Sequence, residues 1–257
     1  SNADGIWSET TGSLQLVARD GDAAPGTPAG VVFSDIVEGL HDSLSINAAG
    51  QLAFHSGLAG DGVDASNASG YWLGDADTLR LGARAGDAAP GVAGATFGAF
   101  EFYGTPRLNS AGQVSLHRLL SGPGITAATD DGIWTGLPDA LQLVVWERSF
   151  SPGLPPGTSL SQFGNPAAFS EDGTVAFRAR NGTPWTVLKS DGSSLEPVAT
   201  TGDSAPGAPG ASFDFLLNPT VSATGEVSFL STLLGDNVDA TNDGGIWSER
   251  SGTLELV

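Results

Sequence analysis

The sequence predicts an all-β protein made of repeated antiparallel sheets. Three features predict it: a tryptophan that recurs along the chain, a four-residue turn that alternates with it, and a Pro-Gly turn in each repeat. No stretch of useful length has the 3.6-residue spacing of an amphipathic helix. Self-similarity along a chain is the signature of a repeat architecture, so each segment is compared with its counterparts in the other repeats.

Composition excludes several classes of protein. The chain has 257 residues, with 10 basic and 29 acidic side chains, a formal net charge of −19, and neither cysteine nor methionine. A chain of this length with 40% hydrophobic residues buries a large core. Lack of cysteine excludes disulfides and thiolate metal sites. The negative charge disfavours nucleic acid as a partner, and no apolar stretch approaches the roughly 20 residues that span a bilayer.

A tryptophan begins a strand-like segment in each repeat, and the spacings are 65, 62, 51 and 62 residues. About six to eight residues later follows an alternating run such as Leu14-Gln15-Leu16-Val17. Alternation with a period of two predicts half-buried strands, and the Gly- and Asp-containing turns between the two segments predict hairpins. The recurring tryptophans are Trp7, Trp72, Trp134, Trp185 and Trp247.

A second signature has Asn or Ser at its first position and Gly at its fourth. Its first copy is Asn47-Ala48-Ala49-Gly50, followed by the strand-like Leu52-Ala53-Phe54. In a type I turn the first side chain accepts bonds from the backbone and Gly takes the crowded last position, so each copy predicts a turn between two strands. The other copies begin at Asn109, Ser170 and Ser222.

A third signature is a Pro-Gly pair, first seen as Ala24-Pro25-Gly26. Pro presets a negative φ and Gly accepts a positive one, which suits the two central positions of a type II turn. We interpret this turn as the element that closes each repeat. The later copies are Pro90-Gly91, Pro152-Gly153 and Pro206-Gly207.

Together the signatures predict a β-propeller-like array of four-stranded antiparallel blades. A blade that starts before the Asn/Ser turn gives four full blades over 41–88, 104–148, 163–203 and 215–257. An N-terminal hairpin over 4–19 lacks its partner strands, and either forms an incomplete fifth blade or fills a gap in the ring. The competing architectures are an open β-solenoid and a row of small sheets. Residues 4–257 are expected to form one domain.

The residues Asn47 to Phe54 resemble a bacterial tandem-repeat family named for the motif Asn-x-x-Gly-x-x-Ala-Phe, in which choice-of-anchor exported proteins are found. The first copy matches all four named positions, whereas Ser115 and Leu116 replace the Ala-Phe pair in the second. The resemblance spans essentially the whole chain. It implies an exported, cell-surface protein and brings no established activity.

Two further observations favour export. Ser1-Asn2-Ala3 resembles the remnant of a cleaved expression tag, and a signal peptide is the segment most commonly removed upstream of such a tag. The chain also contains a single lysine, Lys189. We therefore expect an extracellular or cell-surface protein.

Two matching loops are the best candidates for a metal site. Each places Asp, Asp and Asn three residues apart just before a tryptophan-bearing strand, and oxygen ligands in a flexible loop suit calcium. The competing interpretation is that these side chains only cap local turns. The residues are Asp61, Asp64 and Asn67 in one loop, and Asp236, Asp239 and Asn242 in the other.

A residue that recurs in every repeat belongs to the scaffold, so departures from the repeat are the candidates for a binding site. The third repeat is unusual, because four basic and five acidic side chains between 145 and 200 leave it nearly neutral. Aromatic residues there and in the second repeat suit stacking on a sugar or seating a peptide; the alternative is compensation for a degenerate blade. The candidates are Phe100, Phe102, Tyr103, Trp146, Arg148, Phe150, Arg178 and Arg180.

Catalytic signals are weak. His55 and His117 occupy the same place in adjacent repeats, which predicts a polar strand face, and Arg178 and Leu230 fill that place later. Neither a Gly-x-Ser-x-Gly elbow nor a His-Glu-x-x-His motif occurs. The sequence favours an exported binding module for a glycan or a surface protein, without catalytic residues or a cofactor other than candidate calcium. The alternatives are a propeller glycoside hydrolase or polysaccharide lyase, and a structural spacer.

Overall fold

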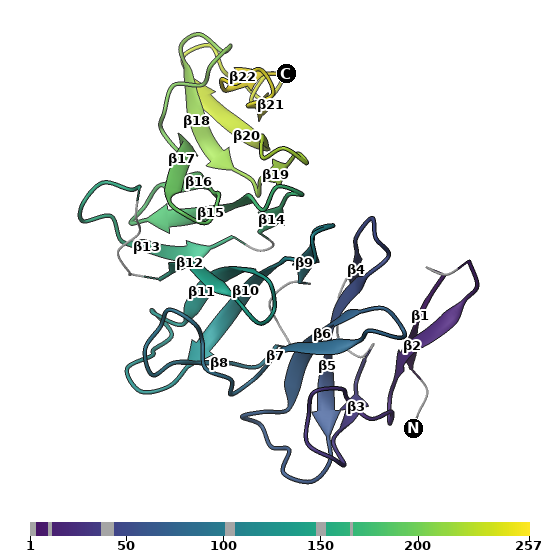
Figure 1. Ribbon diagram of the computed structural model, residues 1–257. Coiled ribbons are helices and arrows are strands. Elements are labelled where there is room, and N and C mark those ends of the chain that lie inside the picture. Colours follow the sequence, from purple (N-terminus) through teal and green to yellow (C-terminus); the bar gives the residue numbers. More distant parts are fainter. Residues whose placement is uncertain (1–3, 10–11, 37–43, 101–105, 148–152, 165–166) are drawn as a thin grey trace. The chain divides into compact units, whose positions relative to one another are not determined.

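The computed structural model describes residues 4–9, 12–36, 44–100, 106–147, 153–164 and 167–257, and is drawn in Figure 1. Four residues of the predicted ligand patch, Phe102, Tyr103, Arg148 and Phe150, lie outside the described residues. The chain divides into two compact units. The first comprises Ser1–Asp130 with Gly136–Gln142, and the second comprises Asp131–Thr135 with Leu143–Val257.

The first unit contains a hairpin, one complete sheet and three further strands. The hairpin joins β1 (Gly5–Ser8) to β2 (Gln15–Arg19). The complete sheet has the order β3-β5-β6-β7, with β4 also paired to β5. Its strands and the three others are β3 (Val32–Ser34), β4 (Leu44–Ile46), β5 (Leu52–Ala59), β6 (Ser69–Gly74), β7 (Arg80–Arg84), β8 (Thr96–Phe97), β9 (Arg107–Leu108) and β10 (Val114–Ser121).

The second unit repeats this plan in two complete sheets. Their orders are β13-β15-β16-β17, with β14 on β15, and β18-β20-β21-β22, with β19 on β20. The strands of the unit are β11 (Asp131–Gly136), β12 (Gln142–Trp146), β13 (Leu160–Phe163), β14 (Ala168–Phe169), β15 (Val175–Asn181), β16 (Trp185–Ser190), β17 (Leu195–Thr200), β18 (Ala211–Leu216), β19 (Thr220–Val221), β20 (Val227–Gly235), β21 (Gly244–Ser248) and β22 (Glu255–Leu256).

Each sheet is a four-stranded antiparallel meander whose first strand is split in two. In the β3–β7 sheet, β3 pairs with the end of β5, as in Phe33 opposite Leu58, while β4 pairs with its beginning, as in Ile46 opposite Leu52. The β13–β17 and β18–β22 sheets split their first strands in the same way. The structure therefore confirms the predicted all-β class, the four-stranded blade-like sheets and the N-terminal hairpin.

The predicted boundaries of the blades are wrong at their N-terminal ends. The sheet predicted over 41–88 begins at Val32, because β3 pairs with the C-terminal end of β5, with Val32 opposite Ala59 and Ser34 opposite Gly57. The Pro-Gly turn therefore opens the following sheet instead of closing the preceding one. A Cβ built on Gly26 would lie 2.7 Å from the Cβ of Leu81 in β7, so this turn packs directly on the last strand of the sheet it precedes.

The recurring tryptophan forms the core of the β3–β7 and β18–β22 sheets. Trp72 is fully buried, with Phe33 edge-on at 4.8 Å between ring centroids and Phe54 stacked at 6.3 Å. Trp247 repeats the arrangement with Phe213 at 4.9 Å and Phe229 at 6.3 Å. Aromatic pairs at such distances add stability beyond the area that they bury.

The Asn/Ser turns form as predicted. The Oδ1 of Asn47 accepts hydrogen bonds from the backbone N–H groups of Ala49 (3.0 Å) and Gln51 (2.9 Å). Its Nδ2 donates to the backbone oxygen of Asn109, the first residue of the next such turn, at 2.8 Å. The motif residue therefore both closes its own turn and ties two successive turns of the first unit together.

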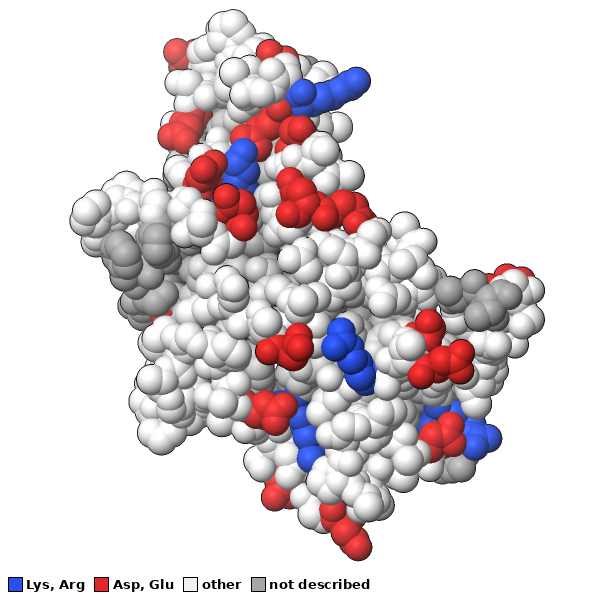
Figure 2. Space-filling view, in the orientation of Figure 1, with Lys and Arg blue, Asp and Glu red and all other residues white. Residues whose placement is uncertain are grey.

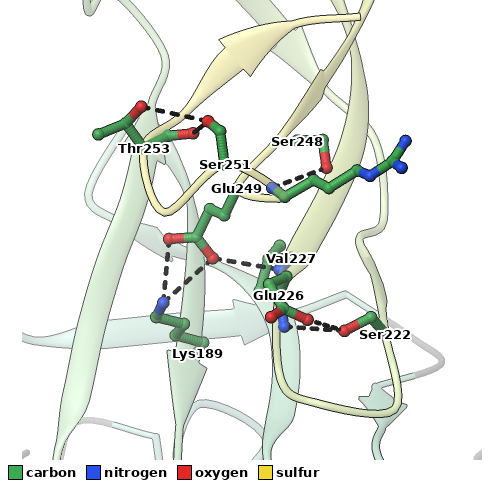
Figure 3. Close-up of polar contacts among 9 residues, drawn as sticks. Lys189, Ser222, Glu226, Val227, Ser248, Glu249, Ser251 and Thr253 are labelled. Atoms are coloured by element: carbon green, nitrogen blue, oxygen red, sulfur yellow. Dashed lines mark hydrogen bonds and ion pairs between the residues drawn. The ribbon is translucent and has the colours of Figure 1, made fainter.

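The two complete sheets of the second unit are joined by the only lysine of the chain. Lys189 Nζ on β16 donates to both carboxylate oxygens of Glu249, at 2.9 and 3.1 Å, and Glu249 also accepts from the backbone N–H of Val227 at 3.1 Å (Figure 3). Both side chains are about a quarter exposed or less, at 26% and 19%. A partly buried ion pair with an added backbone bond holds its geometry better than an exposed pair.

Candidate functional site

A singular tryptophan defines the candidate site. In the antiparallel registers, Phe54 lies opposite Trp72 and Phe229 lies opposite Trp247, but the equivalent Phe177 lies opposite Leu188. The prediction that Trp185 belongs to the recurring set is therefore wrong, because Leu188 fills that core position. The short spacing of 51 residues before Trp185 was the signal that could have revealed this.

Trp185 instead carries two arginines. Arg178 and Arg180 are two residues apart on β15, so their side chains leave the same face of the strand. Trp185 is the cross-strand partner of Arg180 in the β15–β16 pair. The guanidinium carbons of Arg178 and Arg180 lie 4.4 and 4.8 Å from the centre of the Trp185 ring. Cation–π contacts of this kind hold a guanidinium in place and leave its edge free to donate hydrogen bonds.

The next sheet completes the cluster. Arg178 Nη1 donates to the backbone oxygen of Leu216 at 2.6 Å, and its guanidinium carbon lies 5.3 Å from the centre of the Phe215 ring. Phe215 is 46% exposed. Gly164 makes room for the arginine stem, because a Cβ there would lie 2.4 Å from Arg178 Cγ. We call Arg178, Arg180, Trp185 and Phe215 the arginine–aromatic cluster.

The cluster carries positive charge, and the described residues place no acidic side chain against it. Among the residues that the structure describes, no carboxylate forms an ion pair with Arg178 or Arg180, whereas Arg19 and Lys189 each have one. The Nε atoms of both cluster arginines are buried without a hydrogen-bond partner among these residues. Burial, and then the charge of Arg180, lowers the pKa of Arg178. Two like charges over one ring, without a carboxylate partner among the described residues, favour the approach of an anion.

This positive cluster is unusual for the protein. Figure 2 shows acidic side chains scattered over the face that it draws, with few basic ones among them. A local excess of positive charge on a chain of net charge −19 concentrates the field at one place, so it selects anionic groups that the rest of the surface repels.

The other predicted ligand residues are placed differently. Phe100 lies in the first unit and is fully buried, with the guanidinium of Arg118 over its ring at 4.6 Å. Arg118 is itself fully buried, and burial lowers its pKa to about 9. Trp146 ends β12 and is partly buried. The structure thus places Arg178 and Arg180 together, beside Trp185 and Phe215, which the sequence did not single out as members of this cluster.

The two histidines in equivalent places are core residues. His55 is 4% exposed and His117 is 6% exposed, so the predicted polar strand face is wrong at these positions. Burial, and then the charge of Arg118, lowers the pKa of His55 from 6.5 to about 4. A neutral imidazole buried inside the sheet contributes to packing and cannot contact a substrate from solution.

The two candidate calcium loops are closed by their own hydrogen bonds. Asp64 Oδ1 accepts from the N–H and Oγ of Ser66 at 2.8 and 2.6 Å, and Asn67 Oδ1 accepts from the N–H of Asp64. Asp239, Thr241 and Asn242 repeat the pattern. Arg84 donates to Asn67 in the first loop. No group of three acidic or histidine residues with metal-site geometry occurs among the described residues.

The fold and the cluster define an all-β repeat protein with an arginine–aromatic site. The chain belongs to a family of unknown function, DUF7453, whose profile matches residues 1–257. No curated protein matches it. A solved structure of an oligogalacturonate lyase in complex with manganese is similar, with 11% sequence identity and a TM-score of 0.47. The match covers 98% of this chain and 63% of that chain, so this chain spans less than two thirds of the lyase.

No helix long and apolar enough to cross a membrane occurs in the part of the chain that the structure describes.

Proposed function

We propose that this protein is an exported binding module that recognises an acidic saccharide through the arginine–aromatic cluster. The observation that carries the proposal is the pair Arg178 and Arg180, held on Trp185 without a carboxylate partner among the described residues. Export is supported by the resemblance of the repeat motif to exported surface proteins.

The chemistry of the cluster favours a carboxylate on a sugar ring. A guanidinium presents two parallel donors that match the two oxygens of a carboxylate. Phe215, which is 46% exposed, lies within 5.3 Å of the Arg178 guanidinium and offers an apolar surface beside the charge. A uronic acid combines these features, because its ring has an apolar face and carries a carboxylate.

The competing interpretation is that the arginines serve only to pack Trp185. The two interpretations predict different costs of substitution. Arg180→Gln separates them, because the Arg180 guanidinium, unlike that of Arg178, makes no hydrogen bond among the described residues. A packing role predicts that this substitution lowers stability, whereas a ligand site predicts that it weakens binding and leaves stability nearly unchanged.

Isothermal titration of a galacturonate trisaccharide into the protein tests the proposal, with the galactose trisaccharide as the neutral control. We expect binding of the acid only, weakened by salt because the contact is charged. Arg178→Gln with Arg180→Gln is expected to weaken it by about tenfold or more. Arg107→Gln with Arg250→Gln makes the same change of charge at exposed positions and is expected to bind as the parent protein does.

Equal affinity for acidic and neutral sugar, or equal loss in the two double variants, would contradict the proposal. The same samples distinguish a lyase from a binding module, because eliminative cleavage of a uronate chain creates an unsaturated product that absorbs in the ultraviolet. The binding module predicts no such absorbance.

A further inference from the structure

The N-terminal hairpin corresponds to the last two strands of a complete sheet. The β3–β7 and β18–β22 sheets show the strands that complete such a pair. In the β1–β2 pair, Trp7 lies opposite Leu16, and the register shifts just before Trp7. The β6–β7 pair has the same shift and places Trp72 opposite Leu81. In the last sheet Trp247 lies opposite Leu256. The hairpin is therefore equivalent to the last two strands of a complete sheet.

The equivalent strands are paired on both sides, whereas in the described part of the chain β1 forms a sheet on one side only. β6 lies between β5 and β7, and β21 lies between β20 and β22. Among the described residues, β1 pairs with β2 alone, and Figure 1 shows it as the outer strand of the hairpin. A short strand with one free edge presents unpaired backbone donors and acceptors that can accept another strand.

The side chains that a partner would cover are exposed. Trp7 is 51% exposed and Leu16 is 40% exposed, whereas Trp72 and Trp247 are fully buried. The Trp7 ring is nevertheless already oriented as the buried rings are. It lies across Gly5, where a Cβ would be 3.0 Å from its ring, as the Trp72 ring lies across Gly70 at 3.1 Å.

The complete sheets show what covers such a tryptophan. Trp247 Nε1 donates to the backbone oxygen of Pro206 at 2.9 Å, and the rings of Phe213 and Phe229 pack on its indole. Gly207 lies against Leu256, since a Cβ built on it would be 2.7 Å from Leu256 Cβ. All four groups come from one stretch, residues 203–235. The β3–β7 sheet uses Pro25, Gly26, Phe33 and Phe54 in the same way.

We propose that the edge of β1 that faces away from β2 at Gly5, Ile6 and Trp7, together with Leu16, is a docking site for a half-repeat supplied by another polypeptide segment. The occupant is an antiparallel strand pair with a Pro-Gly turn, a phenylalanine on its first strand, and a small residue followed by phenylalanine on its second. The Pro-Gly turn covers Leu16, its proline oxygen accepts from Trp7 Nε1, and the second strand pairs with β1. This site is in the first unit and is independent of the arginine–aromatic cluster.

A peptide with the sequence of residues 203–235 tests this docking, because it contains both phenylalanines and no tryptophan. The protein is labelled with nitrogen-15 on its tryptophans, and the Trp7 indole signal is assigned with Trp7→Phe. We expect the peptide to shift the Trp7 signal alone and to slow its hydrogen exchange at least tenfold. The same peptide with Phe213→Ala and Phe229→Ala is expected to do neither.

Three results would overturn the proposal. They are an unmoved Trp7 signal at saturating peptide, an equal response to the control peptide, and concentration-dependent self-association that Trp7→Phe abolishes, which would assign the edge to a second copy of the chain. The variant with Arg178→Gln and Arg180→Gln is expected to take up the peptide as the parent protein does. Failure of saccharide binding and failure of docking are therefore separate outcomes.

Discussion

The indole Nε1 of Trp72 donates a hydrogen bond of 3.0 Å to the backbone oxygen of Pro25, which precedes it by 47 residues. Trp247 makes the same bond to Pro206 at 2.9 Å. The recurring tryptophan and the Pro-Gly turn, two of the three sequence signatures, thus supply the donor and the acceptor of one hydrogen bond. The Pro-Gly turn folds over the sheet that follows it, and the tryptophan of that sheet holds it there.

Replacing Trp72 with Phe is expected to destabilise the protein by about 2 kcal/mol, because the substitution deletes the bond to Pro25 and leaves a cavity beside Phe33 and Phe54. Trp7→Phe is the matched control, since Trp7 is 51% exposed and its loss is expected to stay within about 0.5 kcal/mol. Urea unfolding measures both. Equal losses would contradict the assignment of Trp72 to the core.

Two adjacent glycines give a sharper test of how the tryptophan is seated. A Cβ on Gly245 would lie 2.6 Å from Trp247 Cη2, whereas a Cβ on Gly244 would have no neighbour within 4 Å. Gly245→Ala is therefore expected to cost about 1 to 3 kcal/mol through overpacking, and Gly244→Ala close to nothing. Thermal melting distinguishes them. A neutral Gly245→Ala would show that the ring does not lie across this strand.

The strands and turns were predictable because they depend on local chemistry. Alternating residues specify the strands, and Asn47 closes its turn with bonds to residues two and four positions away. The first strand of each sheet was not predictable in the same way. β3 has three residues and β4 has three, too few to show a period, and their pairing with β5 joins residues that are 6 to 27 positions apart, from Ile46 with Leu52 to Val32 with Ala59.

The site was half predictable for a related reason. Arg178 and Arg180 stood out because their charges depart from the repeat. The role of Trp185 could not be predicted, because the repeat leads one to expect a core tryptophan near this position. Only the register of β15 with β16 shows that Leu188 occupies the core position. Phe100 is an aromatic residue outside the repeat, which favours a ligand role, but it is buried against Arg118, a contact between residues 18 positions apart.

The buried His55 makes stability depend on pH. Its pKa is about 4 in the folded protein, below the ordinary 6.5, so the unfolded chain binds the proton more tightly. This contribution is fully present above pH 6.5 and is lost as the pH falls toward 4, a change of about 3 kcal/mol. Urea unfolding between pH 7.5 and 4.5 is expected to show a flatter profile for His55→Phe than for the parent protein. Parallel profiles would refute the assignment.

Substitution of Asp239 distinguishes a loop that is closed by its own hydrogen bonds from a loop that binds an ion. Asp239 Oδ1 accepts bonds from the N–H and Oγ1 of Thr241 at 2.9 and 2.6 Å, so Asp239→Ala is expected to lower the melting temperature by the same small amount with and without calcium. Melting in calcium and in chelator measures this. Stabilisation of the parent protein by calcium that Asp239→Ala abolishes would instead establish the predicted calcium site, because a bound ion stabilises the folded state.

The central claim is that recurring residues hold the fold and singular residues bind the ligand. Measuring the free energy of unfolding and the affinity for galacturonate trisaccharide on the same two variants tests it most directly. The account predicts that Arg180→Gln loses about tenfold in affinity at a cost in stability within about 1 kcal/mol, because the Arg180 guanidinium, unlike that of Arg178, makes no hydrogen bond among the described residues, and that Trp72→Phe loses stability at unchanged affinity. Stability and affinity falling together in the arginine variant would contradict it.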